Sequence, residues 1–272
     1  MSHTVSGPGR RGIPTFALLD QIVTELGGTK LTFWPFLSGT GEAIYPYGSG
    51  TDGIRLLTVG ALDGTGAGQH NPMQHVGGIY SYEITNTADS ARIESIDNAN
   101  YSFAGAAFSV GAWVMMQEAL GTVRSVVSKY RSTAATQREY DFRFSATGYP
   151  ILEIYDESVP ADWTSTCTVN VLTPFIWQFV VATYSGTEGA SAIVHYLNAV
   201  AETPVGVETG LFVATEDSTA LLEIGSRDQG GASPAQVFQG KIALPFVTGK
   251  ALTATNVTNI YNIGRKLLGI TN

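Results

Sequence analysis

Residues 177–184 read Trp-Gln-Phe-Val-Val-Ala-Thr-Tyr, and they carry the strongest structural signal in the chain. β-Branched and aromatic side chains suit a pleated sheet, and this stretch has few polar positions. An apolar run without polar alternation is typical of a strand that is covered on both sides. The stretch therefore predicts a central strand buried on both faces.

An earlier stretch, residues 140–145, alternates between apolar and polar side chains instead. Tyr140, Phe142 and Phe144 are interleaved with Asp141 and Arg143, which is the period-two pattern of a strand with one wet face. Further strand-length runs lie at residues 108–116, 124–130, 150–155, 193–197, 221–224 and 237–247. About a dozen strands with turns between them predict an all-β fold of two packed antiparallel sheets. We expect the interior between the sheets to hold three large rings, those of Trp113, Trp177 and Phe238.

Both ends of the chain carry other patterns. Residues 15–26 space their apolar side chains for a short amphipathic helix, which Gly27 and Gly28 would end. Thr253 can cap a second short helix that carries Tyr261 and that Gly264 would end. This helix lacks the Glu or Gln three residues after the cap that completes a capping box.

We therefore divide the chain into residues 1–29, an arm with a helix, and residues 30–272, a β-sandwich. The helix either packs on its own domain or mediates contact with a partner. Residues 1–13, rich in glycine and proline, are either a disordered tail or an arm that orders on a partner. The residues expected to anchor the chain to a partner are Arg10, Arg11, Phe16 and Leu19.

Charge and cysteine content disfavour several classes of protein. The 272-residue chain has a net charge of −8, which argues against nucleic-acid binding because phosphate recognition needs a positive surface. Cys167 is the single cysteine, so no internal disulfide is expected. No apolar stretch reaches the ~20 residues of a membrane span, and we expect no secretory leader.

Several short motifs follow one another along the chain. They are Leu31-Thr-Phe-Trp-Pro35, Phe108 to Val114, Ser128-Lys-Tyr130, Trp177 to Tyr184, Ile224-Gly-Ser226 and Phe238 to Ile242. In this order they resemble the laminin-G-like branch of the concanavalin A-like lectin/glucanase superfamily. The resemblance implies a jelly-roll β-sandwich with a short helix near its C-terminal end, and the periodicity of residues 15–26 adds the N-terminal helix. Function on a shared fold depends on the individual site, and this branch binds or builds more often than it catalyses.

Catalysis by the glycosidases of the superfamily uses two carboxylates that point into one cleft. The nearest cluster here runs from Glu153 to Glu157, but Glu153 and Asp156 would face opposite sides of a regular strand. Glu94 and Asp97 fail for the same reason. The four histidines show no zinc-type spacing. The sequence therefore predicts no catalytic residue and a protein that is not an enzyme.

Binding is the activity that the resemblance leaves. The candidate calcium ligands are Asp97, Asn98, Asn100 and Asp228, although such clusters are common in ordinary turns. The candidate glycan contacts are Tyr149, Tyr155 and Trp163, which we expect in or beside loops; otherwise these rings cover the edges of the core. No other cofactor is expected.

Three functions compete on this basis. The first is a virion structural protein on a phage surface, such as a capsid decoration protein, head fibre or tail component, with an accessory glycan-adhesion role. It would reach the virion surface by assembly in the host cytoplasm and contact capsid proteins through its arm. The second is a free extracellular glycan-binding module. The third is a glycosidase with an unfamiliar site. A homo-oligomer is compatible with each of them.

Overall fold

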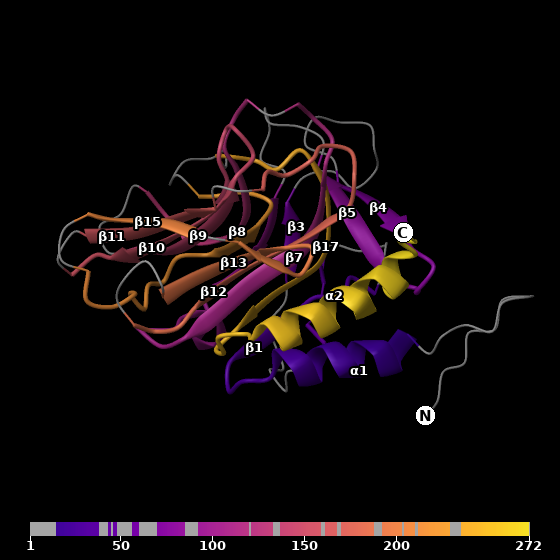
Figure 1. Ribbon diagram of the computed structural model, residues 1–272, viewed down its shortest axis with the longest axis horizontal. Helices are drawn as coiled ribbons and strands as arrows, with labels where there is room; N and C mark the ends of the chain where they lie inside the picture. The colour runs from indigo at the N-terminus through magenta and orange to yellow at the C-terminus, as the bar shows by residue number, and fades with distance from the viewer. Residues whose placement is uncertain are drawn as a thin grey trace, which may run out of the picture.

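The computed structural model shows two antiparallel sheets and two helices (Figure 1). The structure describes residues 15–37, 43–44, 46–47, 56–59, 70–84, 92–119, 121–132, 137–158, 161–167, 170–187, 192–202, 204–209, 212–228 and 235–271. The arm residues Arg10 and Arg11 lie outside these ranges.

The two sheets contain eight and nine strands among the described residues. In spatial order the first holds β14 (Val200–Glu202), β13 (Ile193–Leu197), β12 (Gln178–Tyr184), β7 (Phe108–Met116), β17 (Gly240–Thr248), β5 (Tyr80–Ile84) and β4 (His70–Gln74), with β1 (Leu31–Phe33) also paired to β17. The second holds β15 (Pro204–Thr209), β11 (Ala161–Cys167), β10 (Pro150–Asp156), β9 (Arg138–Phe144), β8 (Arg124–Tyr130), β16 (Leu222–Ile224), β6 (Arg92–Ser95), β3 (Leu56–Val59) and β2 (Ala43–Ile44). The predicted all-β sandwich is confirmed.

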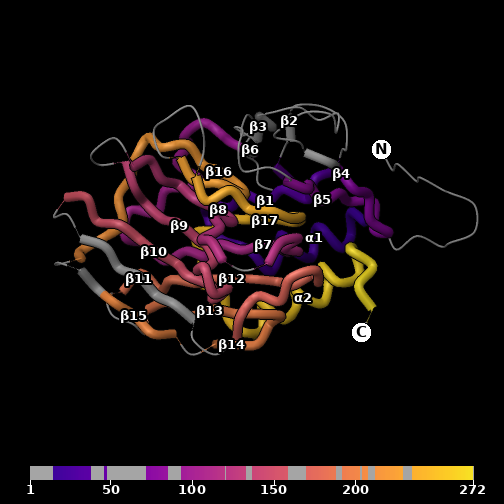
Figure 2. Tube along the Cα trace, turned by 90° about the horizontal axis from the view of Figure 1, so that it is seen from above, coloured from indigo at the N-terminus to yellow at the C-terminus, as the bar shows by residue number. Residues whose placement is uncertain are grey.

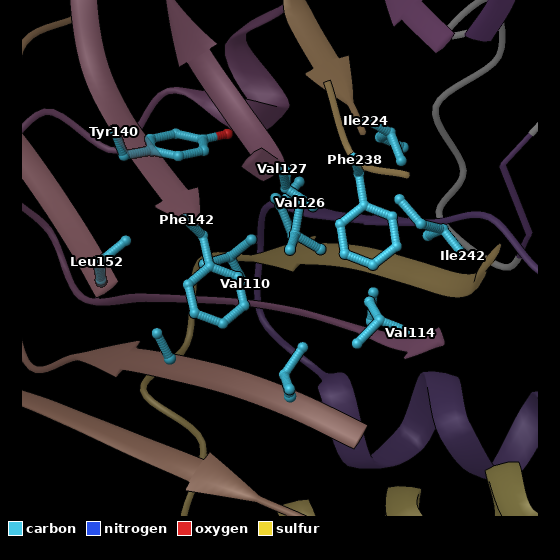
Figure 3. Packing of buried hydrophobic residues seen from close by; sticks show 14 of the residues in the cluster. Val110, Val114, Val126, Val127, Tyr140, Phe142, Leu152, Ile224, Phe238 and Ile242 are labelled. Atoms are coloured by element: carbon cyan, nitrogen blue, oxygen red, sulfur yellow. The ribbon is translucent and has the colours of Figure 1, made fainter. Parts of the chain in front are cut away.

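The main core lies between the sheets (Figure 3). Strand alternation sends Tyr140, Phe142 and Phe144 of β9 inward, and they meet Phe238 and the valines of β7. The buried faces of both sheets are apolar, so the hydrophobic effect holds the layers together.

A second core lies on the outer side of the eight-stranded sheet. The helices α1 (Thr15–Leu26) and α2 (Ala254–Leu268) lie side by side across this face (Figure 1). Trp113 of β7 belongs to this core, where its ring stacks on that of Tyr261 at 5.3 Å. Gly264 of α2 lies so close to Trp113 that an added Cβ would stand 2.1 Å from Nε1 of the indole.

These positions correct two expectations. Of the three rings, only Phe238 lies between the sheets, because Trp113 points to the helix layer and Trp177, half-buried just before β12, packs against the same layer. The C-terminal helix does have a capping box, in which Asn256 takes the place of Glu or Gln and bonds reciprocally with Thr253. The expected stop at Gly264 is wrong, because the helix continues to Leu268 and ends at Gly269, whose backbone is left-handed.

Helix α1 packs on the body of the protein. Leu19 is fully buried in the helix-side core, so it stabilises the fold and is not open to a partner, whereas Phe16 is 52% exposed. The helix therefore packs on its own domain, the first of the two alternatives, and contact of its exposed side with a partner stays a prediction. Neither described helix is long and apolar enough to cross a membrane.

Candidate functional site

The outer side of the nine-stranded sheet is polar. In Figure 1 the two helices lie on the opposite side of the protein, against the other sheet. Because Tyr140, Phe142 and Ile154 point into the core, the residues between them on β9 and β10 point outward. These outward residues are Asp141, Arg143, Glu153 and Tyr155.

Carboxylates line up across this face. In register order, one cross-strand row contains Glu153 of β10, Asp141 of β9, Ser128 of β8, Glu223 of β16 and Glu94 of β6. Like charges directly opposite each other destabilise a sheet unless cations compensate them. The row therefore needs basic partners.

Two arginines supply this compensation. The guanidinium of Arg143 donates through Nη1 to Asp141 Oδ2 at 2.9 Å and also to Glu153. Arg227 donates through Nη1 to the same oxygen of Asp141 at 3.2 Å. Asp141 is completely buried, and Ser125 donates to its other oxygen at 2.9 Å.

Two tyrosine rings extend this ionic group. The guanidinium of Arg227 lies 4.3 Å from the ring centre of Tyr130, and that of Arg138 lies 4.9 Å from the ring centre of Tyr155. The two rings meet edge to face at 5.3 Å. Each arginine thus gains cation–π attraction as well as an ion pair. We call the group the outer-face array; its members are Arg138, Arg143, Arg227, Tyr130, Tyr155, Asp141 and Glu153.

The electrostatics of the array do not suit acid–base hydrolysis. Burial raises the pKa of Glu153, but the charge of Arg143 and hydrogen bonds from Tyr155 and Arg143 outweigh it, so the pKa lies below its ordinary value. A glycosidase acid needs the opposite shift, because it must hold a proton near neutral pH. The arrangement instead presents fixed donors and acceptors, and these can bind hydroxyl groups.

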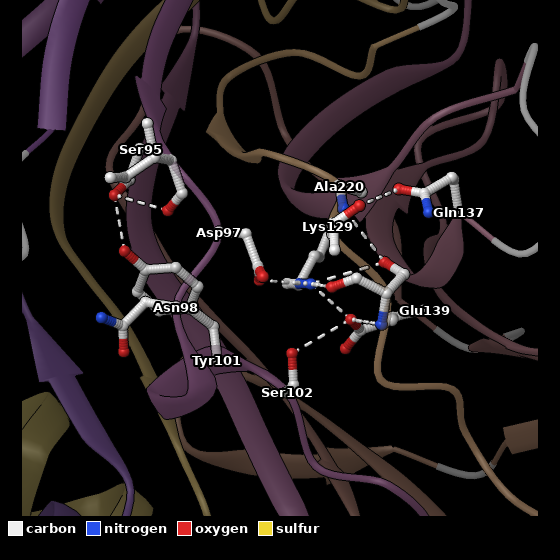
Figure 4. A network of polar contacts seen from close by, with 12 residues as sticks. Ser95, Asp97, Asn98, Tyr101, Ser102, Lys129, Gln137, Glu139 and Ala220 are labelled. Atoms are coloured by element: carbon white, nitrogen blue, oxygen red, sulfur yellow. Dashed lines mark hydrogen bonds and ion pairs between the residues drawn. The ribbon is translucent and has the colours of Figure 1, made fainter.

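The predicted calcium ligands meet basic side chains in the structure. The ammonium of Lys129 lies 3.0 Å from Asp97 Oδ1 and also bonds to Glu139 and to the carbonyl of Ser218 (Figure 4). Asn98 caps the short helix η1 (Ala99–Tyr101) by accepting from the backbone N–H of Asn100.

Asp228 faces Arg131 at 3.6 Å. A cation would therefore compete with Lys129 at Asp97 and with Arg131 at Asp228. Within the described part of the chain, no group of three or more His, Cys, Asp and Glu side chains is arranged to hold a metal ion. The calcium site stays a prediction.

The predicted glycan contacts occupy three different environments. Tyr149 is partly exposed in the turn between β9 and β10. Tyr155 is a strand residue rather than a loop residue, and it is buried beneath Arg138. Trp163 lies in β11 opposite Ile154, and its side chain lies outside the described part of the structure.

Sequence reasoning missed the arginines and Asp141 as site residues. The alternation of β9 and β10 was visible in the sequence and does predict a wet face there. The register that sets Glu153 against Asp141, and the segment that brings Arg227 to both, involve residues far apart in the chain.

Fold and polar face together define a two-layer β-sandwich with helices against one sheet and a largely buried ionic cluster on the outer side of the other. Residues 86–258 match the family profile described as "Concanavalin A-like lectin/glucanases superfamily", in its laminin G branch, and the chain belongs to this family. The resemblance read from the sequence is thereby confirmed for the family. No curated protein sequence matches the chain.

Solved structures share the fold at low sequence identity. Domain 4 of AbnA, an extracellular arabinanase from Geobacillus stearothermophilus solved with arabinotriose, is 15% identical with a TM-score of 0.56, over 85% of this chain and 98% of that one. The binding domain of Paraclostridial Mosquitocidal Protein 1 is 12% identical with a TM-score of 0.56, over 85% of this chain and 51% of that one. This chain therefore spans about half the length of the toxin domain.

A Trypanosoma rangeli sialidase mutant with trans-sialidase activity is 10% identical with a TM-score of 0.59, over 94% of this chain and 39% of that one. Identities this low establish the fold and leave the activity open.

Proposed function

We propose that this chain is a non-catalytic carbohydrate-recognition module that binds at the outer-face array. The observation that carries the proposal is the array itself, in which arginines, carboxylates and tyrosines crowd onto the sheet face that no described helix covers. The arabinanase domain solved with arabinotriose and a botulinum neurotoxin binding domain solved with SialylT share this fold and support the proposal.

Sugar hydroxyls both donate and accept hydrogen bonds, so a good site offers both functions at fixed spacing. The array contains both kinds of group, because guanidinium donors lie beside carboxylate acceptors and the ion pairs between them hold both in place. Arg138, whose side chain is 31% exposed, lies at the start of β9, and the partly exposed Tyr149 lies in the turn at the opposite end of the β9–β10 hairpin. An oligosaccharide lying along the hairpin would meet both residues.

The charges of this face favour a neutral sugar. Each of the four arginines on this face is paired with a carboxylate. Arg131 pairs with Asp228, and Arg138 pairs with Glu157. Arg143 pairs with both Asp141 and Glu153, and Arg227 pairs with Asp141. Because the positive charges are already compensated, an anionic glycan gains little over a neutral one.

The test is a glycan array followed by titration calorimetry. We expect a neutral oligosaccharide to bind, and Arg138→Ala and Tyr149→Ala to weaken that binding at least about tenfold, the cost of losing one charged hydrogen bond or one contact ring. Lys266→Ala removes an exposed side chain on helix α2, away from the outer-face array; it is the matched control and should bind normally. Absence of any glycan ligand, or full affinity in both the Arg138 and the Tyr149 variant, refutes the proposal.

The setting that we propose for this module is the surface of a virion. Leu19 is committed to the helix-side core, but exposed Phe16 remains at the start of α1, next to the arm that carries Arg10 and Arg11. These three residues are the proposed anchor to capsid or other virion proteins. The alternative setting is extracellular, as a free lectin.

Deleting residues 1–14 separates the two settings. The deletion leaves α1 and its buried side chains in place, so the module should stay folded. In lysates of phage-infected cells the full-length chain should sediment with particles, and the truncated chain should not. A full-length chain found only as free protein excludes the virion setting and leaves glycan recognition untouched.

A further inference from the structure

One side of the sandwich carries a strip of exposed valines. Val200 lies in β14, and Val205 and Val207 lie in β15; each is more than half exposed. Strand β14 is the edge of one sheet and β15 the edge of the other, and only residue 203 separates them in the chain. Figure 2 shows both strands along the same side of the protein.

Exposed apolar strand edges are unusual in a monomer. An edge strand presents unpaired N–H and C=O groups, and monomeric proteins protect them with lysines, prolines, bulges or inward-pointing charges. Among the described residues, strand β15 pairs only with β11. It reads Pro-Val-Gly-Val-Glu-Thr, with a proline at its first position only and no basic residue. Its exposed stretch from Val205 to Val207 has no charge at all.

The sequence of β15 is complementary to itself. If two copies of the strand pair antiparallel about Gly206, Val205 of one stands opposite Val207 of the other. Glu208 then stands opposite Pro204, so no two like charges meet. Cross-strand pairs of β-branched residues stabilise such a ladder. A Lys or Glu at either valine position would have prevented this match.

We propose that the chain forms a two-fold symmetric dimer in which β15 pairs with β15 of a second copy. The two nine-stranded sheets then join into one continuous sheet. Because the two-fold axis of antiparallel strands is perpendicular to their sheet, the outer faces of both copies look the same way. The cross-strand row that contains Glu153 and Asp141 ends at Val207, so both arrays lie on this shared face.

The dimer does not depend on glycan binding, but dimerisation would change how strongly the chain binds glycans. Two arrays on one face can engage a multivalent glycan surface together, which raises the apparent affinity without any new contact. A single pair of short strands buries less area than standard interfaces, so the dimer should be concentration-dependent.

Sedimentation velocity over a range of concentrations tests the proposal. The wild-type protein should shift from monomer to dimer, and V205K/V207K should dissociate at least tenfold more readily, since it sets like charges opposite each other. The control V76K charges an equally exposed valine in the β4–β5 turn and should dimerise normally. If the double lysine variant unfolds, the single variant V207K, which sets a lysine opposite Val205, replaces it and should also weaken the dimer.

A second measurement fixes the register. In a C167S background, a cysteine introduced by G206C should cross-link two copies through the two-fold axis, with V76C as the control. A wild-type protein that sediments as a monomer at every concentration overturns the proposal. If V205K/V207K leaves the dimer intact, or if G206C fails to cross-link it, the dimer does not form by pairing of β15 with β15.

Discussion

The buried ammonium of Lys129 offers a sharp test of what stabilises the β8–β9 end of the nine-stranded sheet. Lys129 is completely buried, and it meets Glu139, which is 1% exposed, together with the carbonyl of Ser218 (Figure 4). We consider Lys129→Met, which keeps most of the side-chain volume and removes the charge. The cavity contribution is therefore small.

The magnitude follows from what the variant leaves behind. Removing one member of a buried ion pair costs about 3–5 kcal/mol because the remaining charge has lost its partner. Glu139 keeps hydrogen bonds from Ser102 at 3.1 Å and from the Ser218 N–H at 2.6 Å, which lower the cost. Asp97 is partly exposed, so water can solvate its carboxylate in the variant, and the loss of its ion pair with Lys129 adds only about 0–1 kcal/mol. We expect a loss of about 3–4 kcal/mol, a large share of the ~5–15 kcal/mol of a typical domain.

The pH dependence distinguishes this cause from a simple packing defect. Burial already raises the pKa of Glu139 above its ordinary value despite the opposing charge of Lys129. Without Lys129 the pKa must rise further. An acid whose pKa is higher in the folded than in the unfolded state binds its proton more tightly when folded, so stability increases as pH falls. The deficit of the variant should therefore shrink on acidification.

The assay is urea unfolding of the wild type, K129M, E139Q and K129M/E139Q at neutral and mildly acidic pH. The four free energies form a double-mutant cycle, and we expect a coupling of at least about 2 kcal/mol. An unchanged urea dependence would show that the unfolded state is the same. A K129M cost below about 1 kcal/mol, or one that is equal at both pH values, would refute the reasoning.

Three further perturbations test other parts of the structure. Gly264→Ala drives a Cβ into the indole of Trp113 and should cost about 1–3 kcal/mol in urea unfolding, because overpacked sites relax only partly; a neutral result would mean that α2 can move away. Leu19→Ala should cost about 2–5 kcal/mol, whereas Phe16→Ala, at the exposed end of α1, should lie within about 0.5 kcal/mol of the wild type; equal effects would contradict the packing of this helix. The pKa of Glu153 is lowered in the folded state, so its ionised form stabilises the protein at neutral pH and this stability is lost as pH falls through that pKa; E153Q should be less stable at neutral pH and show a flatter acid limb, and an unchanged limb would contradict the pairing with Arg143.

The sequence by itself determined the architecture. The apolar run at residues 177–184 and the alternation at Tyr140, Phe142 and Phe144 depend on neighbours one or two positions away. Such local patterns specify a strand and its buried face without knowledge of the partner. The glycine pair after residue 26 and the cap at Thr253 likewise define the ends of helices from local chemistry alone.

Only the tertiary structure decided which sheet face each pattern serves. The alternation of Asp141 and Arg143 predicts a wet face, but the partners of these side chains come from β10 and from the segment after β16. Trp113 looked like an inter-sheet residue, yet strand parity turns it toward the helices. A one-residue change of register exchanges the two faces of a strand, and register is fixed by the packing of distant segments. For that reason the array, the Lys129 cluster and the exposed edge of β15 could not be read from spacing in the chain.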